Sequence, residues 1–451
     1  MFRRAFALLM IAAVIAGCVP SSTLPAANTA PNIPAAQQQE PAASVASVPQ
    51  EQPSASAPVE ASTPTEVPTQ VEPTQPEPTA APTEASEPVA AAIQVEAPAG
   101  SEAAAAPEQA ISPLTGLPVQ DAASLNYAPA LVSITNFPVS ARPQAGLSFS
   151  PFVFEMYVGE GMTRFLALFH GDYPVRGEDP NVTLDDDKIG PVRSGRLPFE
   201  DLRSLYNGFL IMASASANVR SSLSAYTNVW GSDTSDINSA MIPVTKLEEI
   251  ASANPTRVQE GALSGLEFAD AAPGNGQDAR KVWIPFSFLN QVMWEYDAAS
   301  GAYLRYQDNA DGKTFIQATD RLNGDPLTYE NVVILMANHH APAETLINID
   351  LMYIDRMPAL LFRDGKMYEI FWTTANGDYE KQTGKVRPIR FIDANGDPFP
   401  LKPGQTWVEI VQPFTRYNET VDSQLYSDLK GKKEPGSGVW AVHFYPTVPE
   451  K

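Results

Sequence analysis

Two arginines beside an expected helix are the strongest candidate for a binding site in this sequence. Residues 188–202 read KIGPVRSGRLPFEDL, so Arg193 and Arg196 come just before Pro198, where a helix is expected to begin. Proline is favoured in the first helical turn because its missing N–H would have no partner there. Free N–H groups and the helix dipole favour an anion at that end. The segment therefore predicts an anion site that includes Arg193, Ser194 and Arg196.

Two further arginines are expected to join this site. Arg142 lies in the Gly- and Pro-containing loop ARPQAGLS, and Arg164 lies in the strand-like run TRFLALF. Guanidinium forks match carboxylate or phosphate groups bidentately, which suits wall polymers, peptide termini or lipid headgroups. The alternative is that these arginines form internal ion pairs, and the acids available for that are Glu155, Glu160, Glu200 and Asp201.

Two glutamates allow a second, enzymatic hypothesis. If Val158 pairs with Thr163 in a hairpin, Glu155 stands diagonal to Arg164 on one face of the sheet. The two residues then form either a structural ion pair or a site carboxylate held by an arginine. Glu155 and Glu160 could instead be the acid pair of a glycosidase, which needs two carboxyl groups about 5–10 Å apart. The alternative function is therefore a cell-wall hydrolase or transferase that uses Glu155 or Glu160.

The remaining polar residues show no pattern typical of a metal or cofactor site. Adjacent histidines on a strand face opposite ways and make a poor chelate. No Ser-His-Asp order and no phosphate-binding loop is present. The sequence therefore predicts neither a metal nor a cofactor, and its four histidines are His170, His339, His340 and His443.

The N-terminus predicts a lipid anchor. Residues 1–17 combine Arg3 and Arg4 with a short apolar run, as in a signal peptide that is too short to span a bilayer. The next residue, Cys18, is the only cysteine of the chain. Residues 15–18, IAGC, resemble the lipobox of bacterial lipoproteins, which implies cleavage before Cys18 and a diacylglycerol thioether on its sulfur. The alternative is an ordinary secreted protein with a chance cysteine at this place.

Composition limits the partners and defines a tether. Residues 18–110 are rich in Pro, Ala, Ser, Thr, Gln and Glu, so they cannot bury enough apolar surface to fold and are predicted to be a disordered tether. The chain has a net charge of −22. An acidic protein is a poor partner for nucleic acid or for anionic lipid. The lipid on Cys18 is therefore expected to hold the protein on the outer, extracytoplasmic face of the cell membrane.

Periodicity predicts two folded domains after the tether. Over 111–255, strand-like runs alternate with helical ones, which predicts an α/β or α+β N-terminal domain. A polar junction at 256–290 is followed by short strands and tight turns, which predict a β-rich C-terminal domain over 291–451. In the first domain the expected strands are Ala130–Thr135, Phe152–Val158, Thr163–Phe169 and Phe209–Ala213, with helices from Pro198, over Asn218–Tyr226 and from a Thr245 capping box.

Several of these blocks resemble a known family. They are PLTGLPV (113–119), ARPQAGLS (141–148), FVFEMYVGEGMTRFLALF (152–169), IGPVRSGR (189–196), the Trp294–Arg305 hairpin, ALLFRDGKMYE (359–369) and LKPGQTWVEIV (401–411). On these blocks the chain is similar to the YerB-like family of bacterial lipoproteins. The resemblance implies an N-terminal family domain followed by a distinct C-terminal one, and it implies no particular reaction. The chain departs from the family pattern at 239–246 and at 314–318.

The sequence as a whole favours binding over catalysis. We expect a membrane-anchored surface lipoprotein that serves as a non-catalytic binding module for an anionic cell-envelope component or a partner protein. The expected ligand-binding residues are Arg142, Glu155, Arg164, Arg193, Ser194 and Arg196.

Overall fold

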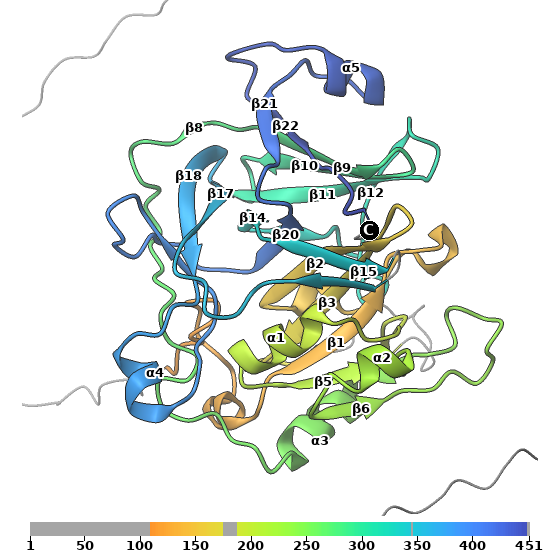
Figure 1. Cartoon of the computed structure of the whole chain (residues 1–451), viewed down its shortest axis with the longest axis vertical. Coiled ribbons are helices and arrows are strands. Elements are labelled where there is room, and N and C mark those ends of the chain that lie inside the picture. Colours follow the sequence, from red (N-terminus) through yellow and green to blue (C-terminus); the bar gives the residue numbers. More distant parts are fainter. Residues whose placement is uncertain (1–108, 175–186, 344–345, 449–451) are drawn as a thin grey trace, which may run out of the picture. The chain divides into compact units, whose positions relative to one another are not determined.

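A computed structural model describes residues 109–174, 187–343 and 346–448 (Figure 1). The expected signal peptide, Cys18 and nearly all of the expected tether lie outside these residues. Within the described part of the chain, no helix is long and apolar enough to cross a membrane.

The largest element is an 11-stranded sheet that draws strands from both sides of the predicted junction at 256–290 (Figure 1). Its order is β19-β18-β17-β14-β20-β2-β3-β1-β5-β6, with β8 paired to β18. The two sides meet where β2 and β20 run parallel, from Phe152 opposite Thr406 to Met156 opposite Ile410. The strands are β1 (Ala130–Thr135), β2 (Phe152–Gly159), β3 (Met162–Phe169), β5 (Phe209–Met212), β6 (Tyr226–Asn228), β8 (Gln277–Asp278), β14 (Asn331–Met336), β17 (Met357–Arg363), β18 (Lys366–Thr373), β19 (Arg390–Ile392) and β20 (Thr406–Val411).

A second sheet of seven strands comes entirely from the C-terminal half. Its order is β12-β11-β10-β9-β22-β21, with β13 paired to β11. Two small two-stranded ladders join β15 to β16 and β4 to β7. The strands of the second sheet are β9 (Lys281–Ser287), β10 (Asn290–Asp297), β11 (Ala302–Asp308), β12 (Phe315–Gln317), β13 (Thr328–Tyr329), β21 (Arg416–Glu419) and β22 (Val439–His443), and those of the ladders are β4 (Lys188–Ile189), β7 (Ile242–Pro243), β15 (His339–Ala343) and β16 (Leu346–Ile349).

Helices are short, so the N-terminal part is less helical than the α/β expectation required. The expected helix over 218–226 is reduced to four residues, because the chain turns and residues 226–228 pair with β5 as a strand. Thr245 lies inside α3 and forms no cap; Pro243 precedes that helix. The helices are α1 (Pro198–Leu205), α2 (Ala217–Arg220), α3 (Val244–Ala253), α4 (Asp378–Thr383) and α5 (Tyr426–Gly431), with 3-10 turns η1 (Ala122–Asn126), η2 (Val139–Ala141) and η3 (Leu147–Phe149).

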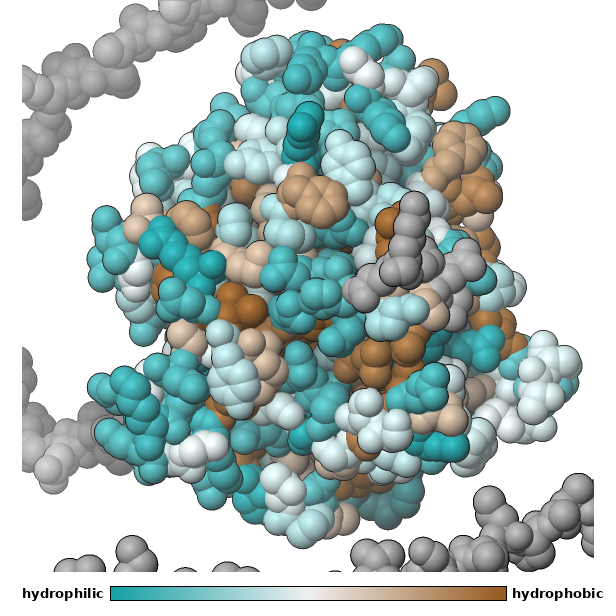
Figure 2. Space-filling model, in the orientation of Figure 1, coloured by the Kyte–Doolittle hydropathy of each residue, from teal (hydrophilic) through white to brown (hydrophobic). Residues whose placement is uncertain are grey.

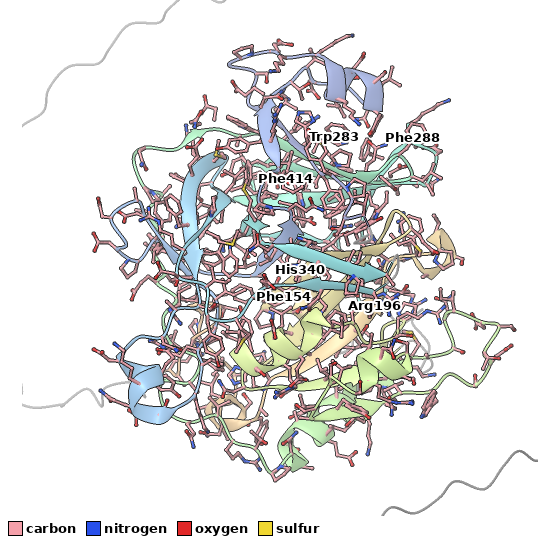
Figure 3. All side chains as sticks on the ribbon, in the orientation of Figure 1. Phe154, Arg196, Trp283, Phe288, His340 and Phe414 are labelled. Atoms are coloured by element: carbon pink, nitrogen blue, oxygen red, sulfur yellow. The ribbon has the colours of Figure 1, made fainter. Side chains whose placement is uncertain are left out.

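One face of the large sheet carries helix α1. Alternate residues of a strand point to opposite faces. Phe152 and Phe154 of β2 pack against Tyr206 at the end of α1, with ring centroids 5.9 and 5.6 Å apart (Figures 1 and 3). The β15–β16 ladder covers the same region, since β16 contacts both β2 and α1.

The other face of the large sheet packs on the second sheet through aromatic side chains. Trp407 of β20 lies 5.1 Å from Phe165 and 5.4 Å from Trp294, measured between ring centroids. Tyr329 completes the group at 5.2 Å from Trp407. All four side chains are buried, so the core between the sheets is formed by residues far apart in sequence.

The outer surface is mostly polar. Figure 2 shows a predominantly hydrophilic face with hydrophobic side chains in small, separate groups. Phe414 and Phe288 are among the large apolar side chains left exposed (Figure 3).

Candidate functional site

The register of the β2–β3 hairpin separates two residues that were predicted to pair. Met156 lies opposite Arg164, and Glu155 lies opposite Phe165, because an irregularity between Tyr157 and Gly159 shifts the pairing by one residue. A shift of one residue moves a side chain to the other face of a sheet. The predicted placement of Glu155 and Arg164 on one face is therefore wrong.

The segment 191–195 lies between the ends of the parallel strands β1 and β5. The N–H of Thr135 donates to Pro191 O and that of Arg193 donates to Ser133 O, at 2.9 and 2.8 Å. On the other side, the N–H of Ala213 donates to Arg193 O at 3.0 Å. Ligands of open sheets with parallel strands bind beyond the carboxyl ends of those strands. The segment therefore brings Arg193 and Ser194 to the edge where such sites form.

Three of the predicted arginines gather at this edge, and we call Arg164, Arg193 and Arg196 the arginine cluster. Ser194 O accepts from Arg164 Nη1 at 2.9 Å and from Arg196 Nη1 at 3.4 Å, so one carbonyl holds two guanidinium groups. Arg196 Nη1 also donates to Gly195 O at 3.0 Å. The Nε atoms of Arg164 and Arg196 are buried and have no hydrogen-bond partner among the described residues.

The three positive charges lie close enough to affect one another. Burial lowers the pKa of Arg164 well below its ordinary value, and the charges of Arg196 and Arg193 lower that pKa further. Burial also lowers the pKa of Arg193 and of Arg196. An anion placed among the three groups would relieve this repulsion.

The acids proposed as internal partners of the cluster are engaged elsewhere. Glu200 pairs with Arg203 at 2.6 Å and accepts from the Ser224 hydroxyl at 2.6 Å. Burial raises the pKa of Asp201 to about 6, although the Leu351 N–H donates to it. Over residues 109–174, 187–343 and 346–448, the arginine cluster forms no ion pair.

The start of helix α1 adds little to the cluster. Pro198 occupies the first turn as predicted, but the N–H of Phe199 donates to Arg196 O and that of Glu200 to Leu197 O, each at 3.2 Å. The first turn also carries the carboxylates of Glu200 and Asp201. The helix end therefore offers neither free donors nor a net positive field.

Arg142 does not join the cluster. Its Nε donates to Asn136 O at 3.2 Å, its Nη1 donates to Asp308 O at 2.7 Å, and its guanidinium lies 4.9 Å from the centre of the Phe137 ring. It lines a separate cavity of about 260 Å³ with Ile316 and Ala318. The structure thus divides the six predicted residues, with Arg164, Arg193, Ser194 and Arg196 together and Arg142 and Glu155 elsewhere.

Glu155 belongs to a buried ionic group between the two sheets. Its Oε2 accepts from Arg305 Nη2 at 2.7 Å, and its Oε1 accepts from the Thr163 hydroxyl at 2.6 Å. The guanidinium of Arg305 lies over Trp407, 4.6 Å from the ring centroid. Glu155 and Arg305 are fully buried. Glu155 is therefore closed to a substrate, while Glu160 lies on the exposed hairpin turn with a φ of 52°.

A second carboxyl group lies beside Glu155 and was not among the residues predicted from the sequence. Glu409 of β20 lies directly opposite Glu155 and accepts from Trp294 Nε1 at 3.0 Å. Burial raises the pKa of Glu409 well above its ordinary value, and the charge of Glu155 raises that pKa further. The signal for this group was a charged residue inside each of two apolar strand runs, Glu409 in TWVEIV and Arg305 in AYLRY.

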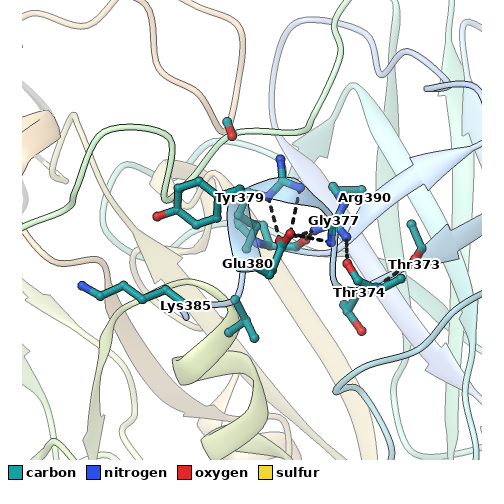
Figure 4. A network of polar contacts seen from close by, with 12 residues as sticks. Thr373, Thr374, Gly377, Tyr379, Glu380, Lys385 and Arg390 are labelled. Carbon is teal, nitrogen blue, oxygen red and sulfur yellow. Dashed lines mark hydrogen bonds and ion pairs between the residues drawn. The ribbon is translucent and has the colours of Figure 1, made fainter. Parts of the chain in front are cut away.

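A separate polar network surrounds helix α4 (Figure 4). Glu380 Oε1 accepts from Arg387 Nε at 2.7 Å and lies 3.4 Å from Arg390 Nη1, and its Oε2 accepts from the Gly377 N–H at 2.7 Å. Burial would raise the pKa of Glu380, but the hydrogen bonds from Arg387 and from backbone N–H groups outweigh it and bring that pKa to about 2. These contacts pair both carboxylate oxygens of Glu380 and fix the start of α4. Over the described part of the chain, no group of three or more His, Cys, Asp or Glu residues is placed to hold a metal ion.

Comparison with known proteins identifies the family. Residues 114–249 match the N-terminal domain, and residues 282–408 the C-terminal domain, of the family described as "Protein of unknown function (DUF3048)". The Bacillus subtilis (strain 168) protein named "Putative lipoprotein YerB" is 27% identical over 316 residues, which are 66% of this chain and 86% of that protein. The crystal structure of YerB protein from Bacillus subtilis matches with a TM-score of 0.52 at 25% identity, covering 67% of this chain and 97% of that one. The chain therefore belongs to the DUF3048 family of YerB-like proteins.

Proposed function

We propose that this protein is a membrane-anchored, non-catalytic binding module that holds an anionic component of the cell envelope through Arg164, Arg193, Ser194 and Arg196. The single observation that carries the proposal is the convergence of three guanidinium groups that share no carboxylate partner among the described residues. Mutual repulsion of buried like charges costs free energy, so such an arrangement favours a bound anion.

The placement of the cluster supports binding more than catalysis. The arginines stand at the carboxyl ends of β1 and β5, beside the backbone of Ser194 and Gly195. Bidentate guanidinium donors suit phosphate and carboxylate groups, both of which occur in anionic envelope polymers. Glu155, which was weighed as a catalytic acid, does not accompany them, because it lies on the other face of the sheet and pairs with Arg305.

The proposed location on the membrane rests on Cys18 and on the Bacillus subtilis relative. The Bacillus subtilis relative is named "Putative lipoprotein YerB", and that name supports membrane anchoring for a member of this family. Residues 15–18 carry the lipobox-like sequence IAGC, so we assign the anchor to Cys18. The chain as a whole has a net charge of −22, so the protein has no electrostatic attraction of its own for anionic lipid.

The proposal is tested by calorimetric titration of the full chain with inorganic pyrophosphate and, separately, with citrate. Replacing Arg193 and Arg196 together by Gln should weaken binding of whichever anion fits by at least about tenfold, because two charge-assisted contacts are lost. Arg220→Gln is the matched control, since Arg220 is an exposed arginine of the nearby α2.

The same variants separate binding from internal ion pairing. If the arginines were structural partners of buried carboxylates, the double variant would lose stability, and the wild type would bind neither anion. If Arg220→Gln weakened binding as much as the double variant does, the cluster would not be the site.

A further inference from the structure

An exposed tryptophan stands at the same sheet edge as the arginine cluster. Trp230 is 69% exposed, whereas the other five tryptophans of the chain are each at most 6% exposed. An indole ring left in water forfeits the stabilisation that its burial would give. Trp230 is therefore the tryptophan that a ligand can reach.

Three parallel strands bring Trp230 to that edge. β5 runs parallel to β1 on one side and to β6 on the other, where Met212 lies opposite Asn228 (Figure 1). Parallel strands end on the same side of a sheet, and ligands of such sheets bind beyond those carboxyl ends. Trp230 comes two residues after the end of β6. It therefore stands on the side of the sheet where the arginine segment 191–195 also lies.

Hydrogen bonds fix the spacing between Arg193 and Trp230. The N–H of Ala213 donates to Arg193 O at 3.0 Å, and the N–H of Val229 donates to Met212 O at 2.8 Å. The chain after β5 thus lies between the arginine segment and the chain that leads into Trp230. Neighbouring strands are about 4.8 Å apart, so the backbones of Arg193 and Trp230 are separated by about 10 Å. Two long side chains can reach one ligand across that distance.

The guanidinium of Arg193 is open to such a ligand. It forms no hydrogen bond or ion pair with any residue that the structure describes, and its nitrogens are not buried. Arg164 and Arg196 differ, because Ser194 O accepts from both of them. An accessible cation and an accessible aromatic face therefore share one edge of the large sheet.

We propose that the anion bound by the arginine cluster is carried on a saccharide whose ring stacks on Trp230. The inference rests on the proposed function, since the cluster supplies the contact with the anion, and it names the class of ligand. The face of an indole ring is electron-rich. A pyranose ring presents weakly positive C–H hydrogens on one face, which complement that surface, while Arg193 matches a phosphate or carboxylate on the sugar. The ligand is thus a phosphate- or carboxylate-bearing glycan.

The test is calorimetric titration of the full chain with glucose 1-phosphate and, separately, with inorganic phosphate. Glucose 1-phosphate should bind at least about fivefold more tightly, because it adds the ring contact with Trp230. If citrate rather than pyrophosphate is the anion that fits the cluster, glucuronate and acetate replace this pair. Phenyl phosphate presents the same anion on an aromatic ring. Tighter binding of phenyl phosphate than of glucose 1-phosphate would overturn the assignment to a saccharide.

Substitutions of Trp230 separate ring stacking from apolar contact. Trp230→Leu removes the ring, so glucose 1-phosphate should bind no more tightly than phosphate, and phosphate binding should stay within about twofold of wild type. Trp230→Phe keeps an aromatic face and should retain most of the gain. Phe414→Leu is the matched control, since Phe414 is 61% exposed and lies well apart from Arg196 (Figure 3). A gain that survives in Trp230→Leu, or that is lost equally in Phe414→Leu, would refute stacking on Trp230.

The exposure of Trp230 also provides a spectroscopic readout. Acrylamide quenches accessible tryptophans, and the other five are buried, so quenching in the wild type reports mainly on Trp230. Saturating glucose 1-phosphate should protect the fluorescence from acrylamide, whereas inorganic phosphate should not. Equal protection by the two ligands would mean a change elsewhere in the protein and would contradict a stacked sugar.

The outcomes distinguish this inference from the proposed function. If the small anions and the sugar anions all fail to bind the wild type, the arginine cluster is not an anion site and both proposals are wrong. If the small anions bind and the sugar adds nothing, the cluster remains an anion site and the saccharide inference alone is wrong.

Discussion

Arg305 Nη2 donates to Glu155 Oε2 at 2.7 Å between the two sheets, and the two side chains lie 150 residues apart in sequence. Glu155 comes from β2 of the large sheet and Arg305 from β11 of the second sheet. The pair therefore ties the two sheets together at the centre of the core. It also explains why the carboxylate that the sequence offered as a catalytic acid is closed to any substrate.

Removing the cation of this pair should destabilise the protein strongly. Arg305→Met keeps most of the side-chain volume but leaves the buried Glu155 carboxylate unpaired, which should cost about 3–5 kcal/mol in the free energy of unfolding. Chemical denaturation measures the change. Arg280→Gln is the control, because Arg280 pairs with Asp422 on the exposed surface, and its loss should cost under about 1 kcal/mol. Equal losses in the two variants would refute the special role of the buried pair.

Glu409 should make stability fall as pH rises. Burial and the neighbouring Glu155 raise the pKa of Glu409 in the folded state above its unfolded value. Glu409 then holds its proton more tightly in the folded than in the unfolded state, so its contribution to stability is greatest below the unfolded pKa and declines from about pH 4.3 up to the folded pKa. Glu409→Gln keeps an oxygen for Trp294 Nε1 and has no proton to lose.

The variant and the wild type should therefore diverge with pH. Their free energies of unfolding should be similar near pH 4. As pH rises toward 8, the variant should become more stable relative to the wild type. Denaturation at several pH values gives the difference directly. A difference that does not change with pH would mean that Glu409 titrates alike in the folded and unfolded states.

The local elements of the fold could be predicted from the sequence, but the long-range pairings could not. The run ALVSIT gives β1 with its observed bounds, Ala130–Thr135, and Asp364 and Gly365 form a tight turn with positive φ. Both features depend on residues that are neighbours in the chain. The placement of β20 beside β2 depends on which distant strands share a sheet, and nothing in a local pattern determines that.

The candidate site shows the same division. Arg193, Ser194 and Arg196 are close in sequence, so their proximity was predictable. The face of the sheet on which Arg164 lies depends on the register of the β2–β3 hairpin. The irregularity before Gly159 shifts that register by one residue from the one expected. The same shift places Arg164 and Glu155 on opposite faces of the sheet, and Glu155 pairs with Arg305.

Cys18 should decide where the protein is found. Because it is the only cysteine and follows a lipobox-like triplet, Cys18→Ala should release the protein from membranes. Fractionation of cells that express the variant measures this, with Ser21→Ala as a control that should stay with the membrane. Full retention of the Cys18→Ala variant on membranes would rule out a lipid anchor at this residue.

The most direct test of the binding proposal is an NMR titration that follows the arginine Nε–Hε signals of the folded protein. Arg164 and Arg196 have buried Nε groups without partners among the described residues, so a bound anion should shift their signals strongly. With pyrophosphate as the probe, the signals of Arg164, Arg193 and Arg196 should move together along one saturable curve. The Arg387 signal should stay still, because its Nε is already bonded to Glu380. Unchanged cluster signals at saturating pyrophosphate, or shifts spread evenly over all exposed arginines, would contradict the proposed anion site.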